Sequence, residues 1–377
     1  MAPIISILAS SPIFLFRYLF DITCFLLPGG RPVKRWTFRQ AALVRSIRLL
    51  LLYWSLALAG NRLTLRPGRE RNRFEVIPSK SPKLYRGPLD DAAIQPEAIG
   101  ATWTPARPLS TAAADKETTV ALHFHGGAFV IGDGRDEDAG FVARTLVRHM
   151  GCTHVCAPQY RLSTPTSGRF PAALQDALTS YIHLIKDIGI PASQIILSGD
   201  SAGANIVLGL LRYISEYGQE IGVPAPAAAA LWSPWTDVGA TLDPNLDMTL
   251  SPNYTSDYLG PEFVLWGALA VTGHGEIDAS GPYLSPHNHP FKMSTEIPMF
   301  VNGGGREVLC DSIIEFSEKF KNQGWPLHLV ISEGCPHDFA LLGPRIGFQE
   351  DAEAAARDAK AFFRSTTALY LKNAGTI

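Results

Sequence analysis

The stretch QIILSGDSAGANIVLGLLRYISEY, residues 194–217, holds the pattern that decides the fold. Its apolar run Gln194–Ser198 is typical of a buried strand, and Ala204–Tyr217 has the residue pattern of a helix. The turn between them, GDSAG at 199–203, consists mainly of small residues. Glycines on either side of Ser201 let the neighbouring backbone approach where a Cβ would clash, so the hydroxyl is presented at a tight turn. We therefore take Ser201 as a candidate nucleophile, with an ordinary Gly/Ser turn as the alternative for this motif alone.

Strand-like and helix-like segments alternate on both sides of this stretch. Alternation of this kind predicts an α/β fold with a mostly parallel sheet covered by helices on both faces. The alternation of strands and helices stops between Trp235 and Pro298. We therefore expect a cap insertion at about 236–297 within a catalytic core of residues 116–377. A helical cap and lead-in region is expected at 1–115. The expected strands are Thr119–Phe124, Thr153–Ala157, Gln194–Ser198, Ala227–Ser233, Met299–Asn302 and Leu327–Ser332, and the expected helices include 140–149, 311–321 and 350–370.

The composition narrows the class of ligand. The chain has 377 residues, 46% of them hydrophobic, which is enough to bury a large core. A net charge of −2 argues against nucleic acid or a strongly acidic ligand and favours a small, largely neutral substrate. The five cysteines are scattered, so we expect free thiols. The sequence predicts no cofactor and no metal, because the pair His287 and His289 has no further ligands near it in the sequence.

A second glycine motif follows the expected strand Thr119–Phe124. It reads HGGAF, residues 125–129. Glycines at this place allow the backbone N–H groups of Gly126 and Gly127 to face a tetrahedral intermediate, together with the N–H of Ala202. These three groups are the predicted oxyanion hole. We expect His125 to stabilise the loop by hydrogen bonding, and a plain turn is the alternative.

An acid and a base are expected after the nucleophile in chain order. The segment GGGREVLCD, residues 303–311, follows an expected strand and offers Glu307 as the orienting acid, with Asp311 as the second choice one helical turn later. His337 follows the last expected strand in a loop. Its imidazole can accept the Ser201 proton and return it to a leaving group. The predicted triad is therefore Ser201, Glu307 and His337.

The N-terminal region is apolar. Residues Ile4–Leu27 approach the length of a membrane span, but Arg17 and Asp21 lie inside it, and each charge costs roughly 2.5–3.5 kcal/mol at a bilayer centre. These two side chains could pair at i,i+4 on a helix. A second apolar run, Leu49–Gly60, follows the basic stretch Arg31–Arg48. We favour two cap helices over the catalytic core, with attachment to an intracellular membrane as the alternative and secretion less favoured, since no signal cleavage site is evident.

These motifs together resemble the hormone-sensitive-lipase branch of the α/β-hydrolases, and fungal members in particular. The resemblance runs from about Thr118 to Phe363. It rests on HGGAF at 125–129, YRL at 160–162, FPAA at 170–173, GDSAG at 199–203, SPWTD at 233–237, EVLCD at 307–311 and PHDF at 336–339.

The resemblance implies the same oxyanion hole and the same triad, and a cap that includes the N-terminal helices. The branch more often has Asp at the first position of the acid motif, where this chain has Glu307 and carries Asp311 at the last position. The function expected from the resemblance is hydrolysis of a carboxylic ester of a small or medium-sized, largely apolar substrate through an acyl-serine intermediate. A biosynthetic enzyme that performs thioester release, lactone opening or elimination is the first alternative, and a non-catalytic small-molecule binding protein is the second.

Overall fold

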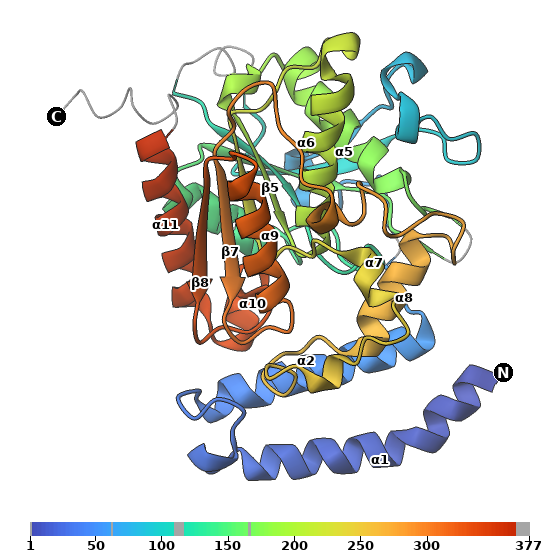
Figure 1. Cartoon of the computed structure of the whole chain (residues 1–377), viewed down its shortest axis with the longest axis vertical. Helices are drawn as coiled ribbons and strands as arrows, with labels where there is room; N and C mark the ends of the chain where they lie inside the picture. The colour runs from blue at the N-terminus through green and yellow to red at the C-terminus, as the bar shows by residue number, and fades with distance from the viewer. Residues whose placement is uncertain (1, 62, 109–116, 165–166, 367–377) are drawn as a thin grey trace.

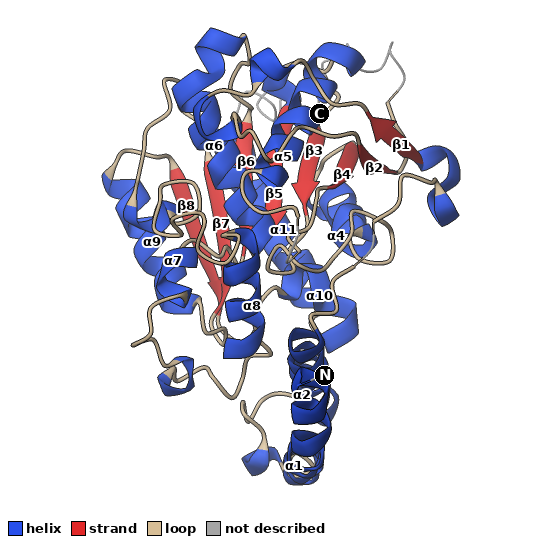
Figure 2. Ribbon diagram, turned by 90° about the vertical axis from the view of Figure 1, so that its right-hand side faces the viewer, coloured by secondary structure: helices blue, strands red, loops and turns tan. Residues whose placement is uncertain are grey.

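A single twisted sheet forms the centre of the molecule (Figure 1 and Figure 2). The structure is a computed structural model and describes residues 2–61, 63–108, 117–164 and 167–366, with side chains described from residue 12 onward. Within these residues the strand order is β1-β2-β4-β3-β5-β6-β7-β8. The strands are β1 (Phe74–Ile77), β2 (Ile99–Thr104), β3 (Val120–Phe124), β4 (His154–Gln159), β5 (Ile195–Asp200), β6 (Ala228–Trp232), β7 (Met299–Gly304) and β8 (Leu327–Ser332).

The pairing of the strands agrees with the alternation in the sequence. The six strands from β4 to β8 in spatial order pair in parallel, whereas β1 and β2 extend the sheet by antiparallel pairing, with Thr104 opposite Val155. Residues Val120–Phe124 and Ile195–Asp200 are buried throughout, as expected for strands covered on both faces. The predicted fold class, an α/β-hydrolase fold with a mostly parallel sheet, is confirmed. Strands β1 and β2 were not predicted.

Helices cover both faces of the sheet. Helices α5, α6 and α9 lie on one side (Figure 1), and α11 lies on the other together with α4, which it contacts (Figure 2). The predicted C-terminal helix at 350–370 begins one residue early, and its last four residues lie outside the described residues. The α-helices are α1 (Ala2–Cys24), α2 (Phe38–Ala57), α4 (Gly140–Thr145), α5 (Ala172–Ile182), α6 (Ala202–Ile221), α7 (Val238–Thr241), α8 (Pro261–Val271), α9 (Cys310–Asn322), α10 (Phe339–Ile346) and α11 (Gln349–Thr366).

Short helical segments connect these elements. Two are π-helical, Leu146–Met150 after α4 and His183–Ile188 after α5. The 3₁₀ segments are Pro28–Gly30, Gly68–Arg73, Pro82–Leu84, Gly87–Leu89, Ala192–Gln194, Met248–Leu250 and Pro286–Asn288.

The N-terminal helices lie at one end of the molecule, with α2 between α1 and the remainder (Figure 1). The sequence suggested a separate helix at Leu49–Gly60, but α2 is one continuous helix that includes most of the basic stretch before it. It begins at a capping box in which the Thr37 side chain accepts from the Gln40 N–H and the Gln40 side chain accepts from the Thr37 N–H. Within the described chain, no helix is long and apolar enough to span a membrane.

The acidic residue of α1 has a different partner from the one suggested by the sequence. Asp21 binds Arg45 of α2 at 2.6 Å, in place of the i,i+4 pair with Arg17. The interhelical pair forms because Asp21 lies on the side of α1 that packs against α2. Tyr18 lies on the same side, and its hydroxyl is 2.9 Å from that of Ser46. Phe25, just after the helix, is buried there.

Candidate active site

Ser201 occupies a strained turn between β5 and α6. Its φ and ψ angles are 51° and −115°, a conformation that L-residues rarely adopt. The flanking glycines make the turn possible. A Cβ at Gly203 would lie 2.0 Å from the carbonyl oxygen of Phe124, and one at Gly199 would lie 2.4 Å from that of Gly203. The turn therefore requires these glycines, and it places the Ser201 hydroxyl at the start of a 20-residue helix.

His337 lies between Ser201 and Glu307. Its Nε2 is 2.9 Å from Ser201 Oγ, and its Nδ1 is 2.5 Å from Glu307 Oε2. All three side chains are buried. Burial acts to lower the pKa of His337, but the hydrogen bond and the charge of Glu307 outweigh it, so the pKa lies above its usual value. The structure thus brings together the three residues that the sequence proposed as a triad.

Glu307 is held by its own backbone turn. Its Oε1 accepts the N–H of Gly304 at 2.6 Å and the hydroxyl of Ser233 at 3.2 Å, which leaves Oε2 directed at His337. Asp311, the second candidate acid, lies in the first turn of α9 and is exposed. The geometry therefore favours Glu307 over Asp311 as the partner of the histidine.

The HGGAF loop follows β3 and lies against the serine turn. Gly127 has a φ of 105°, and Ala128 and Phe129 also have positive φ. The His125 ring is 2.7 Å from the Gly126 carbonyl oxygen and stacks on Tyr160, whose hydroxyl donates to the His125 carbonyl oxygen. Burial lowers the pKa of His125, so the neutral ring can donate to Gly126. His125 therefore stabilises the loop, as the sequence suggested.

The N–H of Gly126 is bound by a carboxylate. It donates to Asp200 Oδ2 at 2.6 Å. This hydrogen bond connects the glycine loop to the serine turn, so the Gly126 N–H already has an acceptor. Among the described residues, no acceptor is found for the N–H groups of Gly127 and Ala202. Both glycines line the same cavity as Ser201 and His337.

Two buried carboxyl groups flank the triad, and sequence reasoning missed both. Asp200 precedes Ser201, and Asp338 follows His337. Burial raises the pKa of Asp338, and the adjacent Asp200 charge raises it further, well above the usual range. Burial also acts to raise the pKa of Asp200, but hydrogen bonds from His123 and Asp338 outweigh it and lower the pKa. Burial and the neighbouring Asp200 charge thus favour the protonated form of Asp338, whose carboxyl group can then donate to the Asp200 carboxylate. Their position next to two motif residues was the signal available in the sequence.

A third buried carboxyl supports the acid loop. Asp257 accepts the N–H groups of Val308 at 2.7 Å and of Tyr258 at 2.7 Å. Burial raises the pKa of Asp257 to about 6, although the nearby charge of His337 acts to lower it. This residue comes from the segment between α7 and α8, far from Glu307 in the sequence, and the sequence offered no signal for it.

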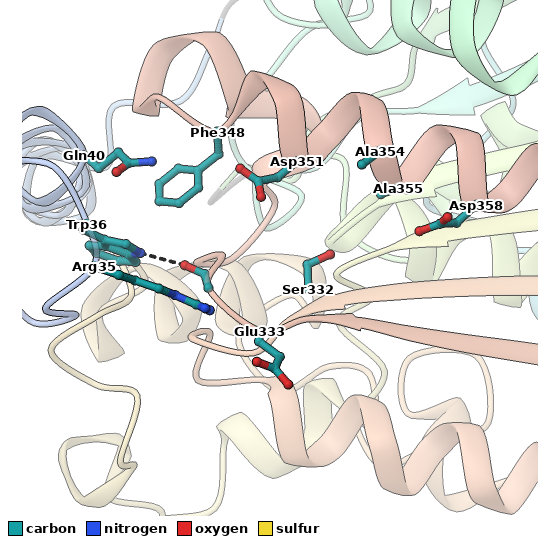
Figure 3. Close-up of a pocket in the computed structure, with 11 residues that line it drawn as sticks. Arg35, Trp36, Gln40, Ser332, Glu333, Phe348, Asp351, Ala354, Ala355 and Asp358 are labelled. Carbon is teal, nitrogen blue, oxygen red and sulfur yellow. Dashed lines mark hydrogen bonds between the residues drawn. The ribbon is translucent and has the colours of Figure 1, made fainter.

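The loop that carries His337 is bound from the N-terminal region. The indole N–H of Trp36 donates to the carbonyl oxygen of Gly334 at 2.7 Å, and the Trp36 ring packs edge-on against Phe348 (Figure 3). Figure 3 also shows Arg35 extending beside this loop toward Glu333. Trp36, which precedes α2, therefore contacts Gly334, three residues before His337.

The triad opens into a cavity of about 720 Å³. Its apolar wall comes from α2, from the predicted insertion, from α10 and from the loop after β3. Parts of both predicted cap regions therefore line it, whereas the described side chains of α1 do not. Within the described residues, no three His, Cys, Asp or Glu side chains gather as a metal site. His287 is buried and lies near Glu315, whereas His289 is exposed. The apolar wall includes Ile47, Leu50, Leu51, Trp54, Leu259 and Phe263.

Comparisons with known proteins agree with this geometry. Residues 121–341 match the family described as having the alpha/beta hydrolase fold. An acetyl-hydrolase of Streptomyces hygroscopicus is 34% identical over 117 residues, which are 31% of this chain and 36% of that protein. The versiconal hemiacetal acetate esterase of Emericella nidulans is 34% identical over 133 residues, 35% of this chain and 44% of that enzyme.

The match therefore spans less than half the length of either relative. A solved structure, an esterase from the bacterial hormone-sensitive lipase family, shares the fold with a TM-score of 0.57 at 23% identity, and the match covers 91% of this chain and 97% of that one. The chain belongs to the α/β-hydrolase family.

Proposed function

We propose that the protein hydrolyses a carboxylic ester through an acyl-Ser201 intermediate. The observation that carries this proposal is the chain of hydrogen bonds from Ser201 Oγ through His337 to Glu307, which opens into the large cavity. His337 Nε2 accepts the hydroxyl proton as Ser201 Oγ attacks the ester carbonyl, and the Glu307 carboxylate stabilises the imidazolium that forms.

The tetrahedral intermediate carries a negative charge on the former carbonyl oxygen. We assign its stabilisation to the N–H groups of Gly127 and Ala202, the latter at the positive end of α6. The third predicted donor, Gly126, binds Asp200 and would contribute by keeping the loop in place. Collapse of the intermediate breaks the bond to the alcohol oxygen, which takes the proton from His337. A water molecule then reverses the sequence, and its attack releases the carboxylic acid.

The cavity supports a substrate with an apolar portion. Its α2 wall is aliphatic and aromatic, and a cavity of this size admits a small or medium-sized molecule. The two relatives named above are described as an acetyl-hydrolase and as an acetate esterase. Acetate esters of a larger apolar alcohol are therefore the first substrates to test.

Covalent labelling tests the proposal. A fluorophosphonate probe should label the wild-type protein, and p-nitrophenyl acetate should be hydrolysed. Ser201→Ala should lose both properties while the protein stays folded, because the hydroxyl contributes little to stability. Ser215→Ala, on α6 with its hydroxyl bound to the Lys292 carbonyl oxygen, is the matched control and should retain both. Labelling that persists in Ser201→Ala would contradict the assignment.

A further inference from the structure

The outer side of α1 carries large apolar side chains that contact solvent. Ile13, Phe16 and Phe20 are 68%, 74% and 60% exposed. They recur at spacings of three and four, so they lie on one side of the helix, opposite the side that contacts Ser46 of α2 through Tyr18. Leu19, Leu26 and Leu27 extend this exposed surface. We call these six residues the α1 apolar face.

Positive charge surrounds the same region. The first 60 residues contain seven of the chain's 33 basic residues and one of its 35 acidic residues. That acidic residue, Asp21, is paired with Arg45, whereas Arg17, Lys34 and Arg39 are exposed. The rest of the chain contains more acidic than basic residues. Positive charge is therefore concentrated at the end of the molecule where α1 lies (Figure 1).

A cleft between α1 and α2 concentrates this charge. It has a volume of about 440 Å³, and four arginines line it against two carboxylates, Asp21 and Glu262. Phe14, Phe25 and Phe263 line the same cleft. A site that combines guanidinium groups with apolar walls suits an anionic headgroup attached to a hydrocarbon chain. The four arginines are Arg17, Arg31, Arg45 and Arg48.

We propose that α1 docks the protein onto an anionic lipid bilayer, with the α1 apolar face in the interface and the basic residues facing the lipid headgroups. A helix with one apolar side and basic flanks binds such a surface by burying apolar area and by electrostatic attraction. A second copy of the chain fits less well, because two α1 ends of this charge would repel each other. This inference goes beyond the proposed ester hydrolysis and does not depend on it.

Flotation with lipid vesicles tests the proposal on the 377-residue chain. Wild-type protein should float with vesicles of phosphatidylcholine and phosphatidylserine, and binding should fall when salt is raised or when phosphatidylserine is omitted. Phe16→Glu combined with Phe20→Glu should weaken binding by about tenfold or more. Val76→Glu on β1, 46% exposed and at the other end of the molecule, is the matched control and should bind like wild type.

Charge reversal separates the two contributions. Arg17→Glu combined with Lys34→Glu should remove the preference for phosphatidylserine.

Wild-type protein that fails to bind either vesicle would overturn the proposal, as would apolar-face variants that bind like wild type. A wild-type dimer in analytical ultracentrifugation that becomes monomeric in the Phe16→Glu, Phe20→Glu variant, without vesicle binding by the wild type, would assign the face to a second copy instead. Hydrolysis of p-nitrophenyl acetate in the absence of vesicles should be the same in all these variants, so loss of ester hydrolysis and loss of docking are distinguishable.

Discussion

Asp200 binds the backbone N–H of Gly126 at 2.6 Å and thereby joins the serine turn to the glycine loop. The two segments are 74 residues apart in the sequence and meet on neighbouring parallel strands, where Phe124 is paired with Gly199. A shift of this contact would move the N–H of Gly127 relative to Ser201. Asp200 and its partner Asp338 are therefore expected to position the site without contacting substrate.

The Asp200 and Asp338 pair can be tested by variants that mimic each protonation state. Asp338→Asn should retain most of kcat, because an amide N–H can donate to Asp200 as the protonated carboxyl does. Asp338→Ala should lower kcat about tenfold or more, since it removes the donor and leaves Asp200 less well held. KM should change little in both variants. Equal losses of kcat in the Asn and Ala variants would contradict the shared hydrogen bond.

Glu307 and Asp311 should differ strongly in their effect on turnover. Glu307→Gln removes the charge that stabilises the His337 imidazolium and should lower kcat by about two orders of magnitude or more. Asp311→Asn is the matched control, because Asp311 is exposed in the first turn of α9, whereas His337 is hydrogen-bonded to Glu307. Its kcat should lie close to that of the wild type. The reverse ranking, measured with p-nitrophenyl acetate, would transfer the role to Asp311.

The pH dependence follows from the direction of the His337 shift. In the proposed mechanism the neutral His337 ring is the base, so activity should fall as pH drops through the pKa of His337. The Glu307 hydrogen bond and charge raise this pKa against the effect of burial, so the acidic limb of kcat/KM should lie above about pH 6.5, the usual value for histidine. In Glu307→Gln the limb should move to lower pH. An acidic limb that stays in place in this variant would argue that another group titrates there.

The same shift has a consequence for stability. A pKa that is raised in the folded state means that protonated His337 is stabilised by folding. This contribution is fully present below the unfolded-state pKa of histidine and is lost as pH rises through the folded-state value. Thermal unfolding of Glu307→Gln should therefore show a smaller loss of Tm with rising pH across this window than the wild type shows.

Trp36 should influence catalysis through the His337 loop. Trp36→Phe removes the hydrogen bond to the Gly334 carbonyl oxygen and should cost about 1 kcal/mol of unfolding free energy. Trp325→Phe is the matched control, because its buried indole N–H also donates to a backbone carbonyl oxygen, that of Phe291, away from the triad. Similar loss of stability with a lower kcat only in Trp36→Phe is the expected result. Equal kcat values in the two variants would confine Trp36 to a structural role.

The sequence by itself determined the class of fold and the candidate triad. Short apolar runs between helical segments predict a parallel sheet, and the GDSAG turn at 199–203 requires small residues because the backbone of Phe124 lies close to Gly203. Local patterns of this kind are readable because strand burial and tight turns act on residues that are near one another in the chain. Chain order then limited the acid and the base to the segments that hold Glu307 and His337.

Only the tertiary structure decided which groups surround the triad. The choice of Glu307 over Asp311 depends on Gly304 and Ser233, which hold its side chain toward His337. The partner of Asp21 depends on how α1 and α2 pack, because this packing places Arg45 of α2 within 2.6 Å of the Asp21 carboxylate. Asp257, Asp338 and Trp36 act through contacts between segments far apart in the sequence. Such contacts follow from burial and hydrogen bonding in three dimensions, so no local pattern of residues records them.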